Sequence, residues 1–158
     1  MTTPEPPTPQ PTGMPAPLAD WGTRALGAII DWLPAAILSA VFSRAGFLSF
    51  VAWLASLAYW AWIGHLEGVT GQTPGKAIMG TRLVNEQGGV IGSGPGIGRK
   101  FAHIVDFLIC GLGFLLPLVD PKRQTIADKL LQSYVVTGAE KKQFAVDLWM
   151  PPQQGTSA

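Results

Sequence analysis

The first long apolar segment opens with the sequence WGTRALGAIIDW, residues 21–32 of the 158-residue chain. This stretch places two opposite charges, Arg24 and Asp31, on one face of a helix, about 10 Å apart along its axis. If the helix crosses a membrane, the long side chain of Arg24 reaches the interface, whereas the short side chain of Asp31 lies inside the hydrocarbon. A carboxylate there costs several kcal/mol unless it is paired, protonated or hydrated. Asp31 is therefore the first candidate functional residue.

The composition indicates a membrane protein. Charged residues make up 13% of the chain and the mean hydropathy is +0.28, whereas a soluble domain has about 25% charged residues. The net charge of +1 gives no reason to expect a nucleic-acid partner, and the single cysteine, Cys110, cannot form an internal disulfide. The N-terminus lacks the basic region of a signal peptide, so we expect insertion to use segments that the protein keeps.

The distribution of apolar residues predicts an all-α membrane protein with about three hydrophobic membrane helices and disordered tails. The predicted membrane segments are residues 25–43, 45–66 and 101–119, and the tails are residues 1–17, which are rich in proline, and residues 138–158. The first two segments are long enough to cross the ~30 Å hydrocarbon core, and Pro34 should kink the first. The third contains His103, Asp106 and Pro117, so it either spans the membrane or forms a re-entrant or interfacial element.

The polar part between the second and third segments predicts a short β-hairpin at the membrane surface. Its strands would be residues 81–84 and 90–91, joined by a glycine-containing turn. We expect Lys76 and Arg82 to contact lipid phosphates there. The glycine-rich residues 92–98 predict a flexible link to the third segment.

A second amphipathic element is predicted after the third segment. Asp120 and Pro121 have the residue types of an N-cap and of the first helical position. They predict a short surface helix over residues 122–132, followed by a strand over residues 133–137.

The basic residues leave the topology open. The loop between the second and third segments and the C-terminal stretch both carry several Lys and Arg residues, so the positive-inside rule places both in the cytoplasm. Three spanning helices would put them on opposite faces of the membrane. We favour three membrane segments, with the side of the C-terminus undecided.

The motifs of known enzymes are not met. Residues 71–76 lack the first glycine of a P-loop, and Ala77 stands where that motif needs Ser or Thr. His65 and His103 have no partners at metal-ligand spacing. We therefore expect no enzymatic activity, no cofactor and no metal site.

Four motifs occur in order along the chain. They are Arg24 with Asp31, GxTPGKxxxGxRLV at residues 71–84, RQTxxDK at residues 123–129 and the valine pair at 135–136. Over residues 18–137 this combination resembles the RDD family of small bacterial membrane proteins. That family is named for one arginine and two aspartates. The resemblance implies that Arg24 and Asp31 are the first two, and that Asp128, or else Asp106, is the second aspartate. Transport of an unidentified ligand is the usual suggestion for the family.

The Arg24–Asp31 spacing recurs at Arg99 and Asp106, where the third segment opens. Two carboxylates close together in a low dielectric do not both ionise cheaply, so one holds a proton or a cation sits between them. This predicts a proton or monovalent-cation site made of Asp31 and Asp106. Arg24 and Arg99 would lie at its cytoplasmic mouth, and His103 would relay protons.

Two functions remain open at this stage. The first is movement of protons, monovalent cations or a small solute by a homo-oligomer in the bacterial inner membrane, through Asp31 with Asp106 or Asp128. The alternative is a non-transporting accessory or scaffold protein with an unidentified membrane partner, in which the charges only fix helix packing. In both cases the lipid bilayer is the expected environment of a multi-pass protein.

Overall fold

The computed structural model describes residues 16–151, so most of the predicted N-terminal tail lies outside the described residues. The elements are α1 (Trp21–Phe42), α2 (Phe47–Thr70), α3 (Pro74–Met79), β1 (Arg82–Asn85), α4 (Ser93–Leu108), η1 (Leu112–Phe114), η2 (Leu116–Leu118), α5 (Ile126–Leu130), β2 (Ser133–Val136) and η3 (Val146–Trp149). The predicted mainly helical membrane fold is confirmed.

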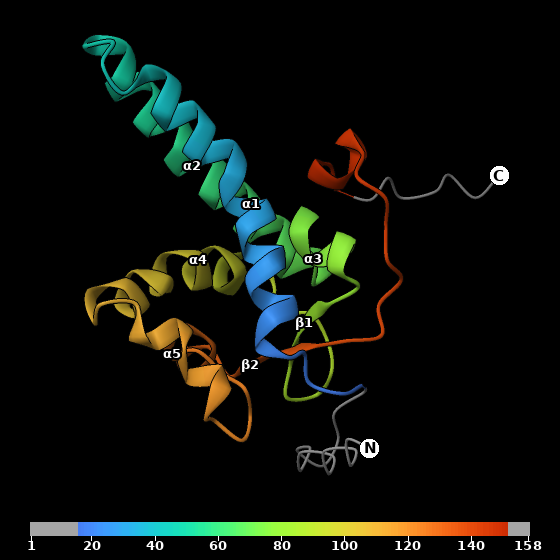
Figure 1. The fold of residues 1–158 in the computed structure, drawn as a ribbon. Helices are drawn as coiled ribbons and strands as arrows, with labels where there is room; N and C mark the ends of the chain where they lie inside the picture. Colours follow the sequence, from blue (N-terminus) through green and yellow to red (C-terminus); the bar gives the residue numbers. More distant parts are fainter. Residues whose placement is uncertain (1–15, 152–158) are drawn as a thin grey trace, which may run out of the picture.

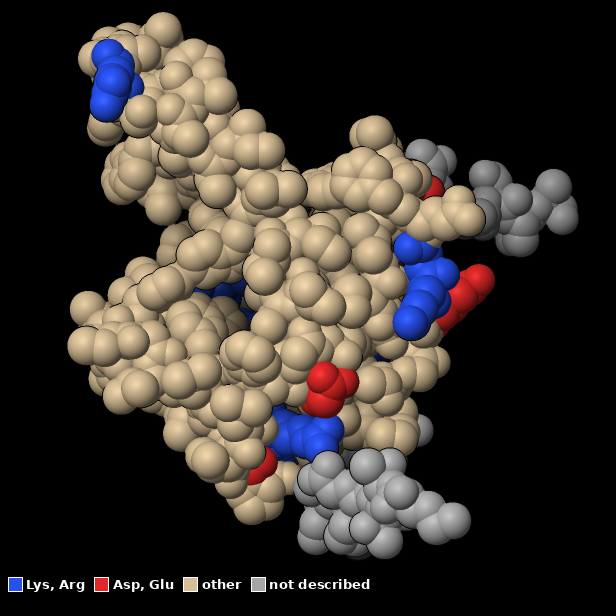
Figure 2. Space-filling model, in the orientation of Figure 1, with Lys and Arg blue, Asp and Glu red and all other residues tan. Residues whose placement is uncertain are grey.

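Helices α1 and α2 form an antiparallel pair that projects from a body made of the other elements (Figure 1). The Asp20 side chain caps α1 by accepting a hydrogen bond from the Thr23 backbone N–H. The helix then continues through Pro34 to Phe42. Both helices are long and apolar enough to cross a membrane. Figure 2 shows their projecting part almost free of charged atoms except at its tip.

The third apolar segment is a bent unit rather than one straight helix. Helix α4 begins at Ser93, so the predicted flexible link over residues 92–98 is wrong: its residues from Ser93 onward form the first turns of α4. After Leu108 the chain turns, and the axis of the following 3₁₀ segment (residues 112–118) makes an angle of 115° with α4. Only if this bent pair counts as one span do the described residues contain a third candidate span.

The predicted hairpin is also wrong, although a two-stranded sheet exists. Strand β1 pairs antiparallel with β2, with Arg82 opposite Val136, and not with residues 90–91. All four residues of β2 are buried. The Ala19 backbone N–H donates to the Val135 carbonyl at 2.8 Å, so the chain just before α1 covers the same sheet.

Helix α5 is shorter than the predicted helix and begins elsewhere. Its N-cap is Thr125 rather than Asp120, and it ends at Leu130. Thr125 and Asp128 form a capping box, in which each side chain accepts a hydrogen bond from the other's backbone N–H. This local device turns the carboxylate of Asp128 back toward the start of the helix, inside the body.

The chain after β2 returns to the body. Lys142 donates its backbone N–H to the Ala77 carbonyl of α3 at 3.0 Å. The Trp62 indole of α2 donates to the Trp149 carbonyl of η3 at 2.9 Å. The described part of the predicted C-terminal tail therefore packs against α2 and α3.

Candidate functional site

Asp128 is the meeting point of three helices. Its carboxylate is fully buried and accepts a hydrogen bond from Arg99 Nε of α4 at 2.8 Å. The Arg24 guanidinium of α1 forms an ion pair with the same carboxylate and also donates to the Arg123 carbonyl. Three of the predicted site residues, one from each of α1, α4 and α5, are thus brought together.

The surrounding charges keep Asp128 ionised. Burial alone would raise the pKa of this carboxyl, but the positive charges of Arg99 and Arg24 lower the pKa well below its usual value. Asp128 therefore carries a full negative charge at neutral pH and acts as a fixed partner for both arginines.

Glu67, near the end of α2, is a second buried acid that the sequence analysis missed. Its carboxylate is fully buried and binds Arg99 Nη1 at 3.0 Å and Lys100 Nζ at 3.1 Å. Lys76 Nζ of α3 binds the same carboxylate at 2.8 Å. The available signal was an acid at the end of an apolar run, next to a loop that carries several basic residues.

The two residues predicted to contact lipid phosphates have different surroundings. Lys76 is largely buried against Glu67, and this burial lowers the pKa of its ammonium group from the ordinary value. Arg82 is exposed at the start of β1. Contact with headgroups stays a prediction for both residues, and Arg82 has the freer side chain.

Asp31 does not bind Arg24, although both lie on α1. It is 2% exposed and accepts hydrogen bonds from the Thr73 hydroxyl at 2.5 Å and from the Gly75 backbone N–H at 2.8 Å. Within residues 16–151, no ion pair joins Asp31 to a cation. Close approach of α3 to α1 makes this arrangement possible, because a Cβ on Gly75 would lie 1.9 Å from the Gly27 carbonyl oxygen.

Asp106 is fully buried and has other partners. It accepts from the Ile126 backbone N–H of α5 at 3.0 Å and pairs with His103 Nδ1 at 2.8 Å. Asp31 and Asp106, the two acids of the predicted cation site, share no hydrogen-bond partner. Asp31 is bonded to residues at the start of α3, whereas Asp106 is bonded to α4 and α5. The contact between His103 and Asp106 is present.

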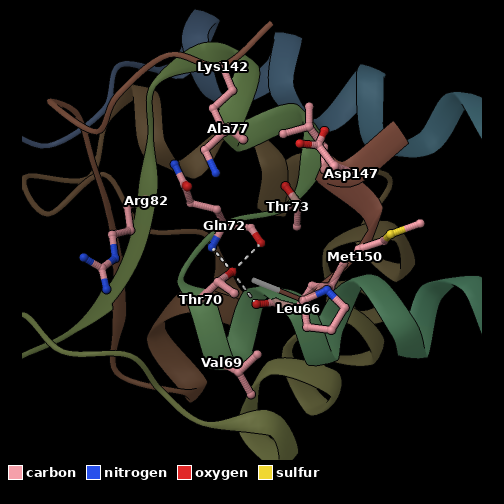
Figure 3. Close-up of a pocket in the computed structure, with 12 residues that line it drawn as sticks. Leu66, Val69, Thr70, Gln72, Thr73, Ala77, Arg82, Lys142, Asp147 and Met150 are labelled. Atoms are coloured by element: carbon pink, nitrogen blue, oxygen red, sulfur yellow. Dashed lines mark hydrogen bonds between the residues drawn. The ribbon is translucent and has the colours of Figure 1, made fainter. Parts of the chain in front are cut away.

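A pocket of about 490 Å³ lies beside this network, between the end of α2, α3 and the C-terminal segment (Figure 3). Its wall combines apolar residues such as Leu66 with the charged residues Arg82, Lys142 and Asp147. Thr73 also lines the pocket, and its hydroxyl is the one that binds Asp31. Asp31 is thus separated from the pocket by a single side chain.

In the described part of the chain, residues 16–151, no cluster of three or more His, Cys, Asp or Glu residues has the geometry to hold a metal ion. The acids of the site instead bind arginine, lysine, histidine, hydroxyl and backbone donors.

Comparison with known proteins gives a family and a few relatives. The model of the RDD family matches residues 18–132. The Proline-rich antigen of Mycobacterium leprae is 35% identical over 70% of this chain and 57% of its own length. The Proline-rich antigen homolog of Mycobacterium tuberculosis is 34% identical over 73% of this chain and 62% of its own length. The chain therefore spans about three fifths of the length of these relatives. No solved structure matches it.

Proposed function

The chain belongs to the RDD family, and we propose that it is a membrane-anchored accessory protein whose buried charges fix the packing of its helices. In this proposal α1 and α2 cross the bacterial inner membrane, and the body of the protein lies on the cytoplasmic side. The protein is multi-pass and acts by holding a membrane partner rather than by catalysis.

The observation that carries this proposal is the bridge formed by Arg99. Its guanidinium binds Glu67 of α2 on one side and Asp128 of α5 on the other. Arg24 extends the bridge to α1, and Lys76 extends it to α3. One network of ion pairs thus ties together four helices around α4.

The network is saturated, which suits a structural role. Among the described residues, every buried side-chain nitrogen and oxygen has a hydrogen-bond partner. A fully satisfied buried polar network makes a fold rigid and specific, whereas a transport site must exchange partners as it works. The depressed pKa of Asp128 points the same way, because this carboxylate takes up no proton near neutral pH.

A second candidate function is movement of protons or a small solute by a homo-oligomer, and one observation favours it. Within residues 16–151, Asp31 is the buried acid that is bonded only to a hydroxyl and a backbone N–H, and the hydroxyl belongs to Thr73 at the pocket wall. A buried acid without a direct ion pair is a better candidate for an exchangeable proton or cation site than one held between two arginines.

Flux measurements with purified protein in liposomes separate the two functions. We expect proton and monovalent-cation flux no greater than in empty liposomes, and we expect Asp31→Asn to give the same result. Ionophore addition is the positive control, and protease protection establishes orientation. Protein-dependent flux that Asp31→Asn abolishes, in a variant that remains folded at the assay temperature, would overturn the accessory function in favour of transport. If flux is absent, crosslinking in membranes is the experiment that identifies the partner.

A further inference from the structure

Helix α4 has two opposite faces. The face that carries Arg99 and Asp106 is buried against α2 and α5. The opposite face is apolar and open, and the apolar surface continues through the 3₁₀ segment. Its exposed members are Phe101, Ile104, Val105, Phe107, Leu108, Ile109, Leu112, Leu115, Leu118 and Val119. A contiguous apolar surface of this kind marks an interaction site, because soluble surfaces rarely leave one in water.

Neither arm of this bent unit is long enough to cross a membrane. The apolar part of α4, residues 101–108, rises about 12 Å. The 3₁₀ segment over residues 112–118 rises about 14 Å at the 3₁₀ spacing. Each arm is less than half of the ~30 Å hydrocarbon core. The 115° angle between the arms turns the second away from the direction of the first.

Two contacts with α1 show how far along that helix the bent unit extends. Phe107, near the end of α4, packs against Trp32 with ring centroids 4.9 Å apart. Phe114, after the bend, accepts a hydrogen bond from the Trp21 indole at 2.8 Å through its carbonyl. Trp21 and Trp32 are separated by about 16 Å along a helix axis. The chain therefore lies near mid-α1 at Phe107 and is back at the first residue of α1 by Phe114.

The distribution of charge favours the same path. The chain contains eleven Lys and Arg residues, and Arg44 alone lies in the turn between α1 and α2. If the bent unit returns to its starting side, the other ten lie on one side of the membrane. If the bent unit crosses the membrane, five of those ten residues, from Lys122 onward, lie on the opposite side together with Arg44. The positive-inside rule favours the first arrangement.

We propose that residues 93–119 form a re-entrant element that enters the cytoplasmic leaflet and leaves it on the same side, with its apolar face against the acyl chains of that leaflet. The N-terminal and C-terminal parts of the described chain then lie on the same, cytoplasmic side. This inference rests on the anchoring by α1 and α2 in the proposed function.

Arg99 and Asp106 hold the element in this position. Both bind α5, Arg99 through Asp128 and Asp106 through the Ile126 backbone N–H. The exposed Lys129 of α5 forms an ion pair with Asp120 just after the 3₁₀ segment. If α4 crossed the membrane, the charged residues of α5 that are bound to it would lie in the hydrocarbon. The re-entrant path avoids this cost.

Cysteine labelling of the full chain tests the path. In a Cys110→Ser background, Lys141→Cys and Arg44→Cys are compared by reaction with a membrane-impermeant maleimide in spheroplasts and in inverted vesicles. We expect at least a tenfold preference for inverted vesicles at position 141 and the opposite preference at position 44. Preferential labelling of both positions in spheroplasts would mean that residues 93–119 cross the membrane, and would overturn the proposal. Preferential labelling of both positions in inverted vesicles would mean that α1 and α2 do not cross, which contradicts the proposed function.

Native Cys110, exposed at the bend, reports what covers the apolar face. A fluorescent label on Cys110 should be quenched by nitroxide lipids whose label lies along the acyl chains. A Cys110–Cys110 disulfide between two copies, with no such quenching, would show that a second copy covers the face instead of lipid. Release of the protein from membranes by alkaline carbonate would instead contradict anchoring by α1 and α2. This result distinguishes failure of the proposed function from failure of the re-entrant path.

Discussion

Arg24 binds Asp128, a residue 104 positions further along the chain, and not Asp31 on its own helix. The two residues of α1 that share a helical face therefore have different tasks. Arg24 fixes the start of α1 to α5, whereas Asp31 fixes the middle of α1 to the start of α3. A single helix is thus attached to the body at two heights by two kinds of interaction, an ion pair and a set of neutral donors.

Removing the charge of Asp128 should destabilise the protein strongly. Asp128→Asn leaves Arg24 and Arg99 buried with one carboxylate fewer between them. Breaking a buried ion pair on one side costs about 3–5 kcal/mol, because an uncompensated charge remains. Thermal unfolding in detergent measures the loss. The control is Asp147→Asn, a change at an exposed acid, which should stay within about 0.5 kcal/mol of the wild type. Equal stability of the two variants would contradict the central place given to Asp128.

Asp128 should also govern stability at low pH. Its pKa is lowered in the folded state, so the unfolded chain binds a proton first as the pH falls. The stabilisation is then complete above about pH 4, the usual pKa of an aspartate, and is lost progressively below it. We expect the melting temperature of the wild type to fall more steeply between about pH 4 and pH 2 than that of Asp128→Asn. Parallel curves for the two proteins would show that other carboxylates dominate this range.

The contact between α3 and α1 should not tolerate a side chain at position 75. In Gly75→Ala the new Cβ would lie 1.9 Å from the backbone oxygen of Gly27, so α3 must move away and weaken the hydrogen bond to Asp31. Overpacking of this kind costs about 1–3 kcal/mol. Gly94→Ala is the matched control, because its Cβ would meet nothing within 4 Å and alanine is the better helix former. Thermal unfolding of both variants gives the comparison, and a Gly75→Ala protein as stable as Gly94→Ala would refute the close contact.

The sequence predicts α1 and α2 well because a long apolar run with few charges has few alternatives to a membrane helix. It is less informative where a residue has two uses. Glycines at 92–98 resemble a linker, yet Gly96 lies in a helix at a crossing with α2, where a Cβ would come within 2.3 Å of the Gly64 carbonyl oxygen. Glycine occurs both in flexible links and where two backbones pack closely, so the sequence alone does not distinguish the two uses.

The residues of the site were easier to predict from the sequence than the ion pairs that they form. Arg24, Arg99 and Asp128 were identified, but helical spacing pairs residues on one helix, while the ion pairs join different helices. Glu67 was missed because it follows a long apolar run and resembles the mere end of a span. The partner of β1 was misassigned for a related reason: residues 90–91 are near in sequence, whereas β2 becomes its neighbour only when the whole body folds.

Asp31→Asn should cost less stability than Asp128→Asn, because Asp31 has no ion pair to break. The amide oxygen that replaces one carboxylate oxygen can still accept the Gly75 backbone N–H, and the amide group can donate to the Thr73 hydroxyl. The loss is then at most that of a charge-assisted hydrogen bond, about 1.5–3 kcal/mol. Asp31→Leu, which removes the acceptors and leaves the Thr73 and Gly75 donors unsatisfied, is the more damaging variant. Thermal unfolding should rank the proteins as wild type, Asp31→Asn, Asp31→Leu in order of decreasing stability. A stabilised Asp31→Asn would indicate instead that the ionised carboxylate is held at a cost to folding, as expected of a group kept for proton or cation binding, and would favour the transport function.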